Sequence, residues 1–361
     1  MLAVEHLKQI GKYELEEFLG GGMANVYRAK DTVLGRRVAV KILTEAAMAD
    51  SEAKARFLQE ARLASNMRHE NIISIYDFGE DHGRPFMVME FVEGETLRDS
   101  IKHAGTGDTY NRLRLALQAA RALDYVHSRK IIHRDVKPEN LHVDKLGKVR
   151  LMDFGIAKAD GVNLTKAGVA VGTPFYMSPE QVLGRPPTVQ ADVYAFGVLL
   201  YELMTGEKAV TAVSMEPIFH QILYDAPDPA PLRAAAVPPD VCDLIMRCTA
   251  KQLIQRPPDM AAVCVELESI LVKAPAVLAA PQHLPPPPGL LSPSSQRPES
   301  NVQLRMPPPP PQKPAPGAYE AMLAQLRTVL RSPVGVMVFT ACAVFICVFM
   351  LFEILAMAGI L

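Results

Sequence analysis

The sequence has few cysteines, and they follow no spacing that binds a metal or builds a disulfide framework. This argues against a zinc module or a cystine-stabilised fold and favours a reducing compartment for the globular part. An excess of charge of one sign is also lacking. Since 38 lysines and arginines stand against 39 aspartates and glutamates, no basic surplus is available for nucleic-acid phosphates. The first twenty residues contain four glutamates among short apolar groups, which argues against a secretory signal there. The cysteines are Cys242, Cys248, Cys264, Cys342 and Cys347.

Composition divides the 361 residues unevenly. Residues 11–272 mix apolar, charged and turn-forming residues as a globular domain does. Residues 273–317 are proline-rich, with unbroken proline runs at 285–288 and 307–311. Because proline fixes φ and removes a backbone donor, we expect a disordered, semi-extended linker there. Docking of an SH3-like or WW-like partner is the alternative use of such a segment.

The C-terminal part contains a long run that is apolar and uncharged. Residues 334–352 carry no charge, and as a helix they would extend roughly 28 Å, close to the hydrocarbon thickness of a bilayer. We predict a transmembrane helix over 333–353, preceded by an amphipathic juxtamembrane helix over 318–332 and followed by a short outer tail over 354–361. Lysine and arginine lie before this span and none follows it. The positive-inside rule therefore predicts a single-pass protein of the cell membrane, held by lipid, with residues 11–272 in the cytoplasm.

The run from His133 to Asn140, followed by Asp153-Phe154-Gly155, carries the chemistry. Asp135 can accept the proton of an attacking hydroxyl, and Lys137 can neutralise a transferring phosphate. Asn140 and Asp153 supply the oxygen ligands that Mg2+ prefers. An isolated Asp-Phe-Gly is more often a plain turn, but the ordered series is typical of phosphoryl transfer.

Upstream, a lysine and a glutamate have the spacing of an ion pair. Lys41 ends the β-branched alternation that starts at Val38, and Glu60 lies in a helix-forming stretch over 52–66. Such a pair can hold the α- and β-phosphates of a nucleotide. Taken alone, both residues could equally be solvated surface charges.

The order of elements adds to these motifs. Alternation predicts a small antiparallel sheet carrying one helix, followed by a helical region. The chain thus resembles the bacterial eukaryotic-like (Hanks-type) transmembrane Ser/Thr protein kinases over residues 11–272. This resemblance implies an α+β, bilobal protein-kinase fold. The expected strands are 13–19, 25–31, 37–43, 74–80 and 85–91, and the expected helices include 52–66, one through Leu113, Leu117 and Ala120, 189–205 and 259–272.

The resemblance also implies a nucleotide site with two departures. The relatives read Gly-x-Gly-Gly-Met-Ala-x-Val-Tyr in the glycine loop, so this chain is one residue short there. His142 stands where relatives carry a leucine beneath adenine, and Met89 takes the gatekeeper position before the hinge. The residues implied for ATP binding are Leu19, Gly20, Gly21, Gly22, Val26, Ala39, Lys41, Glu60, Met89, Glu90, Val92 and His142.

The same resemblance implies how the enzyme is regulated and braced. Arg134 precedes Asp135, an arrangement of kinases that phosphorylation activates, and Thr165 is the implied phosphosite. Thr173 and Lys137 imply protein substrates with serine or threonine hydroxyls instead of tyrosine. In addition, Glu180 should pair with Arg256, and Asp192 should brace the catalytic-loop backbone. The family often has tryptophan where Tyr194 stands, in a chain that has no tryptophan at all.

Two functions remain open at this point. The first is an active membrane-anchored Ser/Thr kinase that uses ATP and Mg2+, with a homodimer as one route to activation. The second is a pseudokinase that binds nucleotide or partners at the membrane without turnover, which the short glycine loop and His142 would favour. A small-molecule kinase on the same fold is disfavoured by Thr173 and the segment that contains it.

Overall fold

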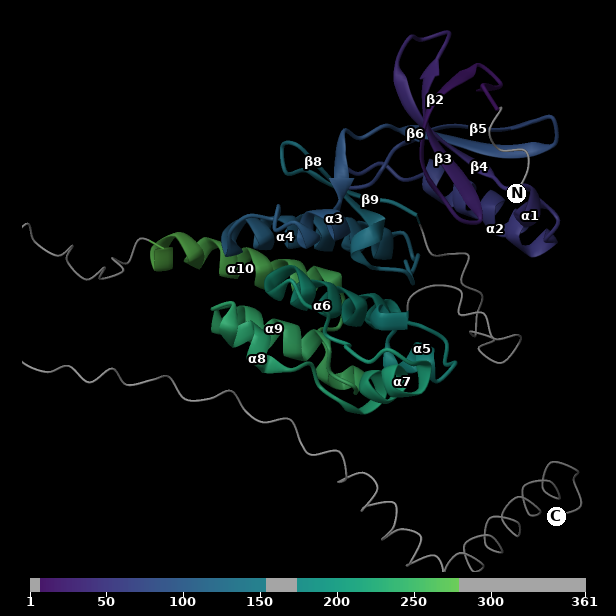
Figure 1. Cartoon of the computed structure of the whole chain (residues 1–361). Helices are drawn as coiled ribbons and strands as arrows, with labels where there is room; N and C mark the ends of the chain where they lie inside the picture. The colour runs from purple at the N-terminus through teal and green to yellow at the C-terminus, as the bar shows by residue number, and fades with distance from the viewer. Residues whose placement is uncertain (1–6, 154–173, 279–361) are drawn as a thin grey trace, which may run out of the picture. The chain divides into compact units, whose positions relative to one another are not determined.

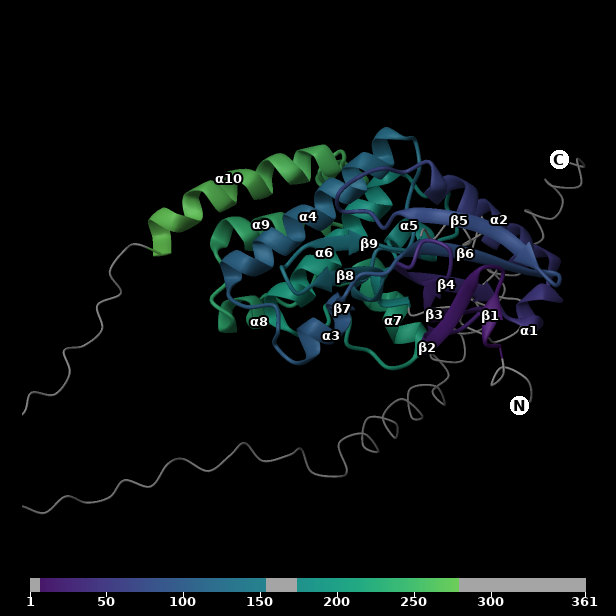
Figure 2. The same cartoon turned by 90° about the horizontal axis from the view of Figure 1, so that it is seen from above.

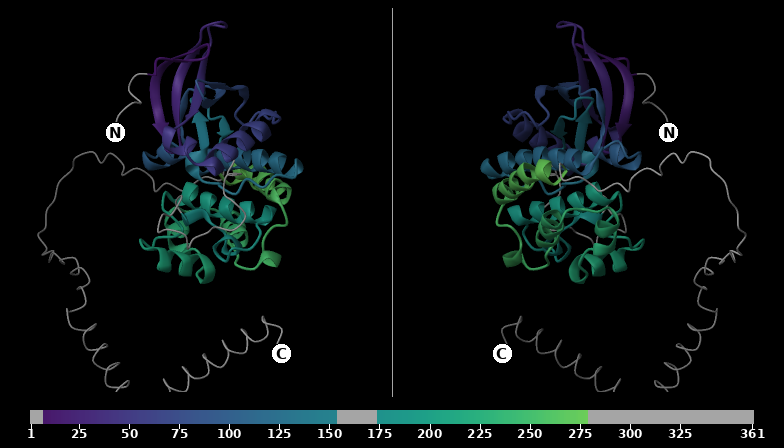
Figure 3. Two further views of the ribbon diagram at one scale, coloured as in Figure 1. Left: turned by 90° about the vertical axis from the view of Figure 1, so that its right-hand side faces the viewer. Right: turned by 90° about the vertical axis from the view of Figure 1, so that its left-hand side faces the viewer.

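The computed structural model describes residues 7–153 and 174–278, and all of them lie in the first of two compact units, Met1–Leu284 (Figure 1). Within this unit a β-rich lobe precedes a helical lobe, as Figure 3 shows with the sheet above the helices. The two-lobed α+β architecture agrees with the expectation from the sequence. The predicted residues Thr165 and Thr173, the linker beyond 278, the juxtamembrane helix and the membrane span lie outside the described residues.

The first lobe is built on a six-stranded antiparallel sheet with the order β1-β2-β3-β4-β6-β5. Strand alternation divides its apolar residues between two faces. Val38, Val40 and Ile42 of β4 pack into one cluster, whereas Ala39 and Leu43 pack on the other face, against α2. Lys41 shares this second face, so the period of the strand directs it toward the helix that carries Glu60. The elements are β1 Gln9–Ile10, β2 Tyr13–Gly21, β3 Ala24–Asp31, β4 Arg37–Leu43, α1 Glu45–Met48, α2 Ser51–Ser65, β5 Ile75–Asp81 and β6 Arg84–Glu90.

Helix α2 begins and faces the sheet for local reasons. The Asp50 side chain caps it by accepting the amide protons of Glu52 and Ala53. Its buried residues Ala53, Phe57, Ala61 and Ala64 recur at helical spacing and pack on the α2 side of the sheet or on the second lobe. Glu60 lies on this buried face and not among the solvated charges of the helix.

The second lobe is organised around α6, which is buried on all sides from Ala191 to Met204. Helix α10 lies along α4, as Figures 1 and 2 show. A three-stranded sheet, β7-β8-β9, lies at the side of this lobe that faces the first one. The elements are β7 Gly94–Thr96, α3 Leu97–Lys102, α4 Thr109–Ser128, η1 Pro138–Asn140, β8 Leu141–Asp144, β9 Val149–Leu151, η3 Pro174–Tyr176, α5 Pro179–Val182, α6 Val189–Thr205, α7 Met215–Tyr224, α8 Pro229–Ala234, α9 Pro239–Cys248, η4 Leu253–Gln255 and α10 Met260–Leu278.

The expected strands and helices are found within a few residues of their predicted positions. Two expectations need correction. The first lobe carries the short helix α1 besides α2, since the Thr44 side chain caps the N-terminus of α1. Helix α10 ends at Leu278 and not at Val272, so it runs into the segment that was expected to be linker. Across residues 7–153 and 174–278, no helix combines the length and apolarity that a bilayer crossing requires.

Candidate active site

A cavity of about 800 Å3 lies between the two lobes. The first lobe contributes the glycine hairpin between β2 and β3, strand β4 and helix α2. The segment from Met89 to Val92 joins the lobes, and the second lobe contributes β8 and the loop before it. Every residue predicted to bind ATP lines this cavity, together with Lys137, Asn140 and Asp153. Residues that lie more than a hundred positions apart in the sequence therefore share one cleft.

Lys41 joins two carboxylates in this cleft. Its Nζ donates to Glu60 Oε1 at 3.1 Å and to Asp153 Oδ1 at 2.7 Å, which confirms the predicted Lys41–Glu60 contact. Burial alone would lower the pKa of the Lys41 ammonium, but Asp153 and Glu60 outweigh it and raise this pKa. Enclosure likewise acts to raise the pKa of Asp153, and Lys41 outweighs it and lowers this pKa. The lysine is thus held as a cation and Asp153 as an anion.

Glu60 behaves differently from Asp153. Burial raises its pKa more than the Lys41 ammonium lowers it, and the nearby Asp153 charge adds to the rise. Its side chain is only 12% exposed, whereas that of Asp153 is 50% exposed. Glu60 is therefore the inner, orienting carboxylate of the pair, and Asp153 is the one that reaches the open cleft.

Across the cleft, Lys137 and Asn140 of one loop both bond to Asp135. Lys137 Nζ donates to Asp135 Oδ2 at 2.8 Å, and Asn140 Nδ2 donates to Asp135 Oδ2 at 3.0 Å and to its carbonyl at 2.8 Å. The lysine ammonium thus lies directly against the Asp135 carboxylate and fixes its orientation. Because the amide nitrogen of Asn140 turns toward Asp135, its oxygen is the atom left to meet a cation.

The backbone of this loop is strained and is braced from below. Arg134 has φ of 65°, a left-handed conformation that non-glycine residues rarely adopt, and Asp153, outside this loop, shares that conformation with φ of 45°. Asp192, buried near the start of α6, accepts the backbone amides of His133 at 2.7 Å and Arg134 at 2.8 Å. His127 of α4 lies 2.8 Å from the same carboxylate. The predicted bracing role of Asp192 is thereby confirmed.

The wall beneath the hinge contains His142. Burial lowers the pKa of its imidazole, although a hydrogen bond to the Val92 backbone favours the charged form. Its Nε2 is buried and has no hydrogen-bond partner in the part of the chain that the structure describes. Opposite it on β9, Arg150 donates to Glu90 Oε1 at 3.4 Å, so the hinge is bonded to the second lobe.

A cluster that the sequence reasoning missed lies next to the catalytic loop. Arg98 of α3 donates to Glu139 Oε1 at 2.8 Å, and it also bonds Glu202 and the hydroxyl of Tyr176. Tyr176 in turn donates to Glu202. The only signal in the sequence was Glu139, an acidic residue between Lys137 and Asn140 for which no neighbouring residue in the sequence offers an ion-pair partner.

The predicted pair of Glu180 and Arg256 is confirmed as a two-pronged ion pair. Arg256 Nη1 and Nη2 donate to the two carboxylate oxygens at 2.9 Å each, and both side chains are buried. Arg256 also bonds the carbonyls of Ala250 and Gln190. Such a pair fixes the position of α5 relative to α6 and the segment before α10, and is better understood as a device of specificity than of stability.

The donor set can be compared with what a metal ion needs. Among residues 7–153 and 174–278, no three His, Cys, Asp or Glu side chains gather as a complete metal site. Asn140 and Asp153 offer two oxygen ligands at the cavity. Mg2+ is usually held by one or two protein oxygens together with substrate phosphates and water, so this sparse set fits Mg2+ bound with a nucleotide.

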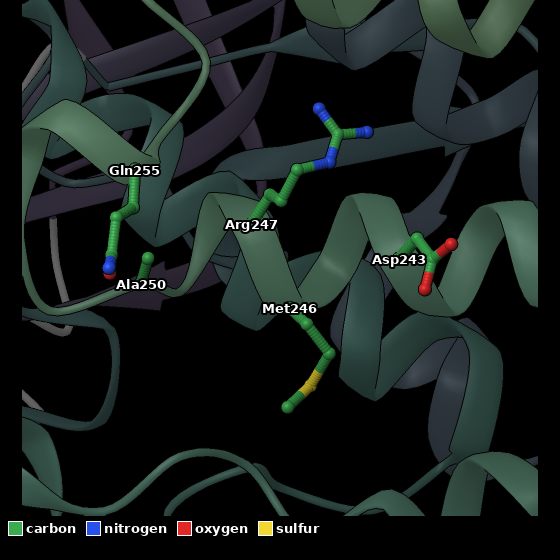
Figure 4. Close-up of a pocket in the computed structure, with 5 residues that line it drawn as sticks. All are labelled: Asp243, Met246, Arg247, Ala250 and Gln255. Carbon is green, nitrogen blue, oxygen red and sulfur yellow. The ribbon is translucent and has the colours of Figure 1, made fainter.

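A second hollow, of about 420 Å3, lies on α9 and the segment after it (Figure 4). Figure 4 shows Arg247 and Met246 pointing to opposite sides of the helix, with Asp243 directed away from both. Arg247 is engaged with Glu266. No group of convergent polar atoms forms there, so the cleft between the lobes is the stronger candidate for chemistry.

Comparison with known proteins agrees with the geometry of the cleft. Residues 13–266 match the protein kinase domain family. Serine/threonine-protein kinase PrkC of Bacillus subtilis is 38% identical over 248 residues, which are 68% of this chain and 38% of PrkC. Serine/threonine-protein kinase PknB of Mycolicibacterium smegmatis is 38% identical over 259 residues, 70% of this chain and 41% of PknB. The chain spans about two fifths of the length of these curated relatives. It belongs to the protein kinase family, among the bacterial Hanks-type Ser/Thr kinases.

Proposed function

We propose that this chain is a membrane-anchored Ser/Thr protein kinase that transfers the γ-phosphoryl group of ATP to serine and threonine hydroxyls of proteins. The observation that carries the proposal is the meeting of two clusters at one cleft. Asp135, bonded by Lys137 and Asn140, lies in the lower lobe, and Lys41, bonded by Glu60 and Asp153, lies in the upper one. A proton acceptor and a fixed cation are thus available at the two ends of a phosphoryl transfer.

Each residue has a separate task in this proposal. Asp135, held in place by Lys137 and Asn140, orients the substrate hydroxyl and takes up its proton. Lys137 then lies beside the group that is transferred and offsets its charge. Lys41 binds the α- and β-phosphates, and Glu60 holds it in the direction of the cleft. The glycine hairpin covers the phosphates with backbone amides, while Val26, Ala39, Met89 and the backbone of Glu90 and Val92 enclose the adenine.

Asn140 and Asp153 would hold Mg2+. When bound, this ion would neutralise charge on the phosphate oxygens and help to orient them. The lowered pKa of Asp153 keeps it an anion over the physiological range. The Asn140 amide nitrogen is used by Asp135, which leaves its oxygen available as a ligand in the same cavity. Both properties belong to the chain itself and suit a hard divalent cation.

Control of the enzyme is proposed to act through the segment between Asp153 and Glu180. A phosphate on Thr165 would carry about two negative charges and bond Arg134, next to the catalytic base. Thr173 is proposed to select serine and threonine over tyrosine by bonding in the catalytic loop.

The proposed organisation places the kinase domain at 11–272 and the linker at 273–317. The juxtamembrane helix follows at 318–332, the membrane helix at 333–353 and the outer tail at 354–361. The charge pattern around the span supports a cytoplasmic kinase held by lipid. A second copy of the chain is proposed as one partner, in a homodimer. An SH3-like or WW-like protein that binds the linker is proposed as another.

The test is phosphate transfer by the full-length chain. Incubation with γ-labelled ATP and Mg2+ should label the protein and an added protein substrate, and Asp135→Asn or Asp153→Asn should each abolish the label. Asp243→Asn, an exposed carboxylate on α9, is the matched control and should retain activity. If the wild-type chain binds ATP but transfers nothing, the enzyme assignment is wrong and the pseudokinase takes its place.

A further inference from the structure

The glycine hairpin is fastened at its tip by a residue outside it. Its turn is very tight, since the Gly22 amide donates to the Ala24 carbonyl at 3.1 Å with only Met23 between them. The carbonyl of Met23 accepts two hydrogen bonds from Thr44, one from the backbone amide at 3.1 Å and one from the hydroxyl at 3.0 Å. Thr44 directly follows β4, three residues after Lys41.

These two bonds fix more than one atom. The Met23 carbonyl and the Ala24 amide belong to one planar peptide unit, in which C=O and N–H point in opposite directions. Holding the carbonyl against Thr44 therefore sets the direction of the Ala24 amide, and Ala24 lines the cleft. The ladder pair of Ala24 and Leu43 leads into this contact and limits sliding of the hairpin along β4.

The Thr44 hydroxyl acts both as a hydrogen-bond donor and as a hydrogen-bond acceptor. It donates to Met23 and accepts the Ala47 amide at 3.3 Å, which caps α1. The tip of the hairpin is thus joined to the start of the helical segment that precedes α2. Since the hairpin is one residue shorter than the pattern of its relatives, it has less chain with which to fold over phosphates, and a fixed tip is a way to keep its amides in place.

We propose that Thr44 is a positioning residue that holds the shortened glycine hairpin in place for binding the phosphates of the nucleotide. The inference rests on the proposed function in that the cleft must bind ATP, but it does not require phosphate transfer. It predicts that Thr44 acts on affinity for the phosphates and not on affinity for the nucleoside.

The experiment measures binding, by calorimetry, of a non-hydrolysable ATP analogue with Mg2+ and of adenosine to the full-length chain. Thr44→Val removes the hydroxyl but keeps the shape and the backbone amide. It should weaken binding of the ATP analogue about five-fold, the effect of one hydrogen bond, and leave adenosine binding unchanged. Thr44→Ser keeps the hydroxyl and should restore binding, whereas Thr44→Ala should resemble Thr44→Val.

The matched control is Thr188→Val. Thr188 caps α6 by accepting the Gln190 amide at 3.3 Å, the same distance as in the Thr44 cap although from the second residue on instead of the third, and it does not line the cleft. It should lower the melting temperature without changing either affinity. The inference would be overturned if Thr44→Val lost adenosine and ATP-analogue binding equally, or lost neither. It would also be overturned if Thr188→Val showed the same loss as Thr44→Val, or if the wild type did not bind the analogue. If the wild type binds the analogue but transfers no phosphate, only the proposed kinase activity fails.

Discussion

Replacing Lys41 with methionine should separate the structural role of this lysine from its catalytic role. Methionine keeps the apolar stem and removes the charge. Lys41 and Glu60 are only 13% and 12% exposed and lie 3.1 Å apart, while Asp153, 2.7 Å from the lysine, is half exposed. The variant therefore leaves Glu60 buried without its cation and next to a second carboxylate.

The cost can be worked out from burial. Removing one partner of a buried ion pair destabilises by about 3–5 kcal/mol. The half-exposed Asp153 can turn to water and Glu60 can take up a proton, so we expect the lower end, about 3 kcal/mol at pH 7.5. Burial already raises the pKa of Glu60, and loss of Lys41 raises it further. An acid whose pKa is raised on folding loses stability as pH rises through the folded pKa. The deficit of Lys41→Met should hence shrink as the pH falls toward 5.

The assay is urea denaturation at pH 7.5 and pH 5 beside labelled-ATP transfer. Lys41→Met should be both inactive and destabilised, and Lys41→Met/Glu60→Gln should regain most of the stability but no activity. Lys54→Met is the matched control. Lys54 of α2 also forms an ion pair with the sheet, through Glu80 of β5, but this pair is 3.6 Å long and the lysine is 39% exposed. This substitution should cost less than about 1 kcal/mol. Wild-type stability of Lys41→Met at both pH values, or transfer by either Lys41 variant, would refute the reasoning.

Four further changes test the site and the tail. In Gly21→Ala the new Cβ would meet Asn25 Oδ1 at 2.4 Å and Phe18 Cζ at 3.3 Å, so these two side chains must give way inside the glycine hairpin, and the KM for ATP should rise with a smaller change in kcat. Burial lowers the pKa of His142, so the imidazole of the unfolded chain takes up a proton before that of the folded chain as pH falls below about 6.5, and the wild type loses stability. His142→Leu lacks this group and should lose less stability than the wild type between pH 6.5 and 5.5. Equal shifts of melting temperature with pH in the two proteins would contradict this. Thr165→Ala should strongly lower autophosphorylation, and phosphopeptide mass spectrometry should find Thr165 as the main site. Deleting residues 333–361 should release an active chain from membranes that retain the full-length protein through a carbonate wash.

Parts of this molecule could be predicted because short motifs carry their own geometry. The alternation of β4 places Lys41 and Ala39 on one face, and Glu60 lies on the buried face of α2. Period alone left both residues as possible surface charges, and their contact was expected because the downstream motifs follow in the order of the kinase family. The bracing by Asp192 and the pair of Glu180 and Arg256 were likewise expected from motifs that the chain shares with its relatives. In each of these contacts one residue lies in a helix or strand that fixes its position, so few positions are open to the residue that bonds it.

Other parts could not be predicted because their partners meet only after the lobes fold. Arg98 lies in a helix of one turn and a half, and its partners Glu139, Tyr176 and Glu202 come from three later segments. No periodicity relates these positions. The same holds for Thr44 and Met23, since a hydroxyl that caps a short helix gives no sign that it also bonds a hairpin. Contacts of single side chains across loops depend on tertiary packing that local pattern does not encode.

The strained catalytic loop shows why the buried helix α6 belongs to the site although none of its residues lines the cleft. The left-handed conformation of Arg134 costs of the order of 1–3 kcal/mol and persists only where surrounding structure over-determines it. Asp192 supplies that constraint, because it accepts two successive backbone amides of the loop from a position buried within the helical core. The core of the second lobe thereby offsets the strain that turns Asp135 toward Lys137 and Asn140. The placement of the proton acceptor is thus a property of the whole helical lobe, and the motif that contains Asp135 could not hold this geometry as an isolated segment.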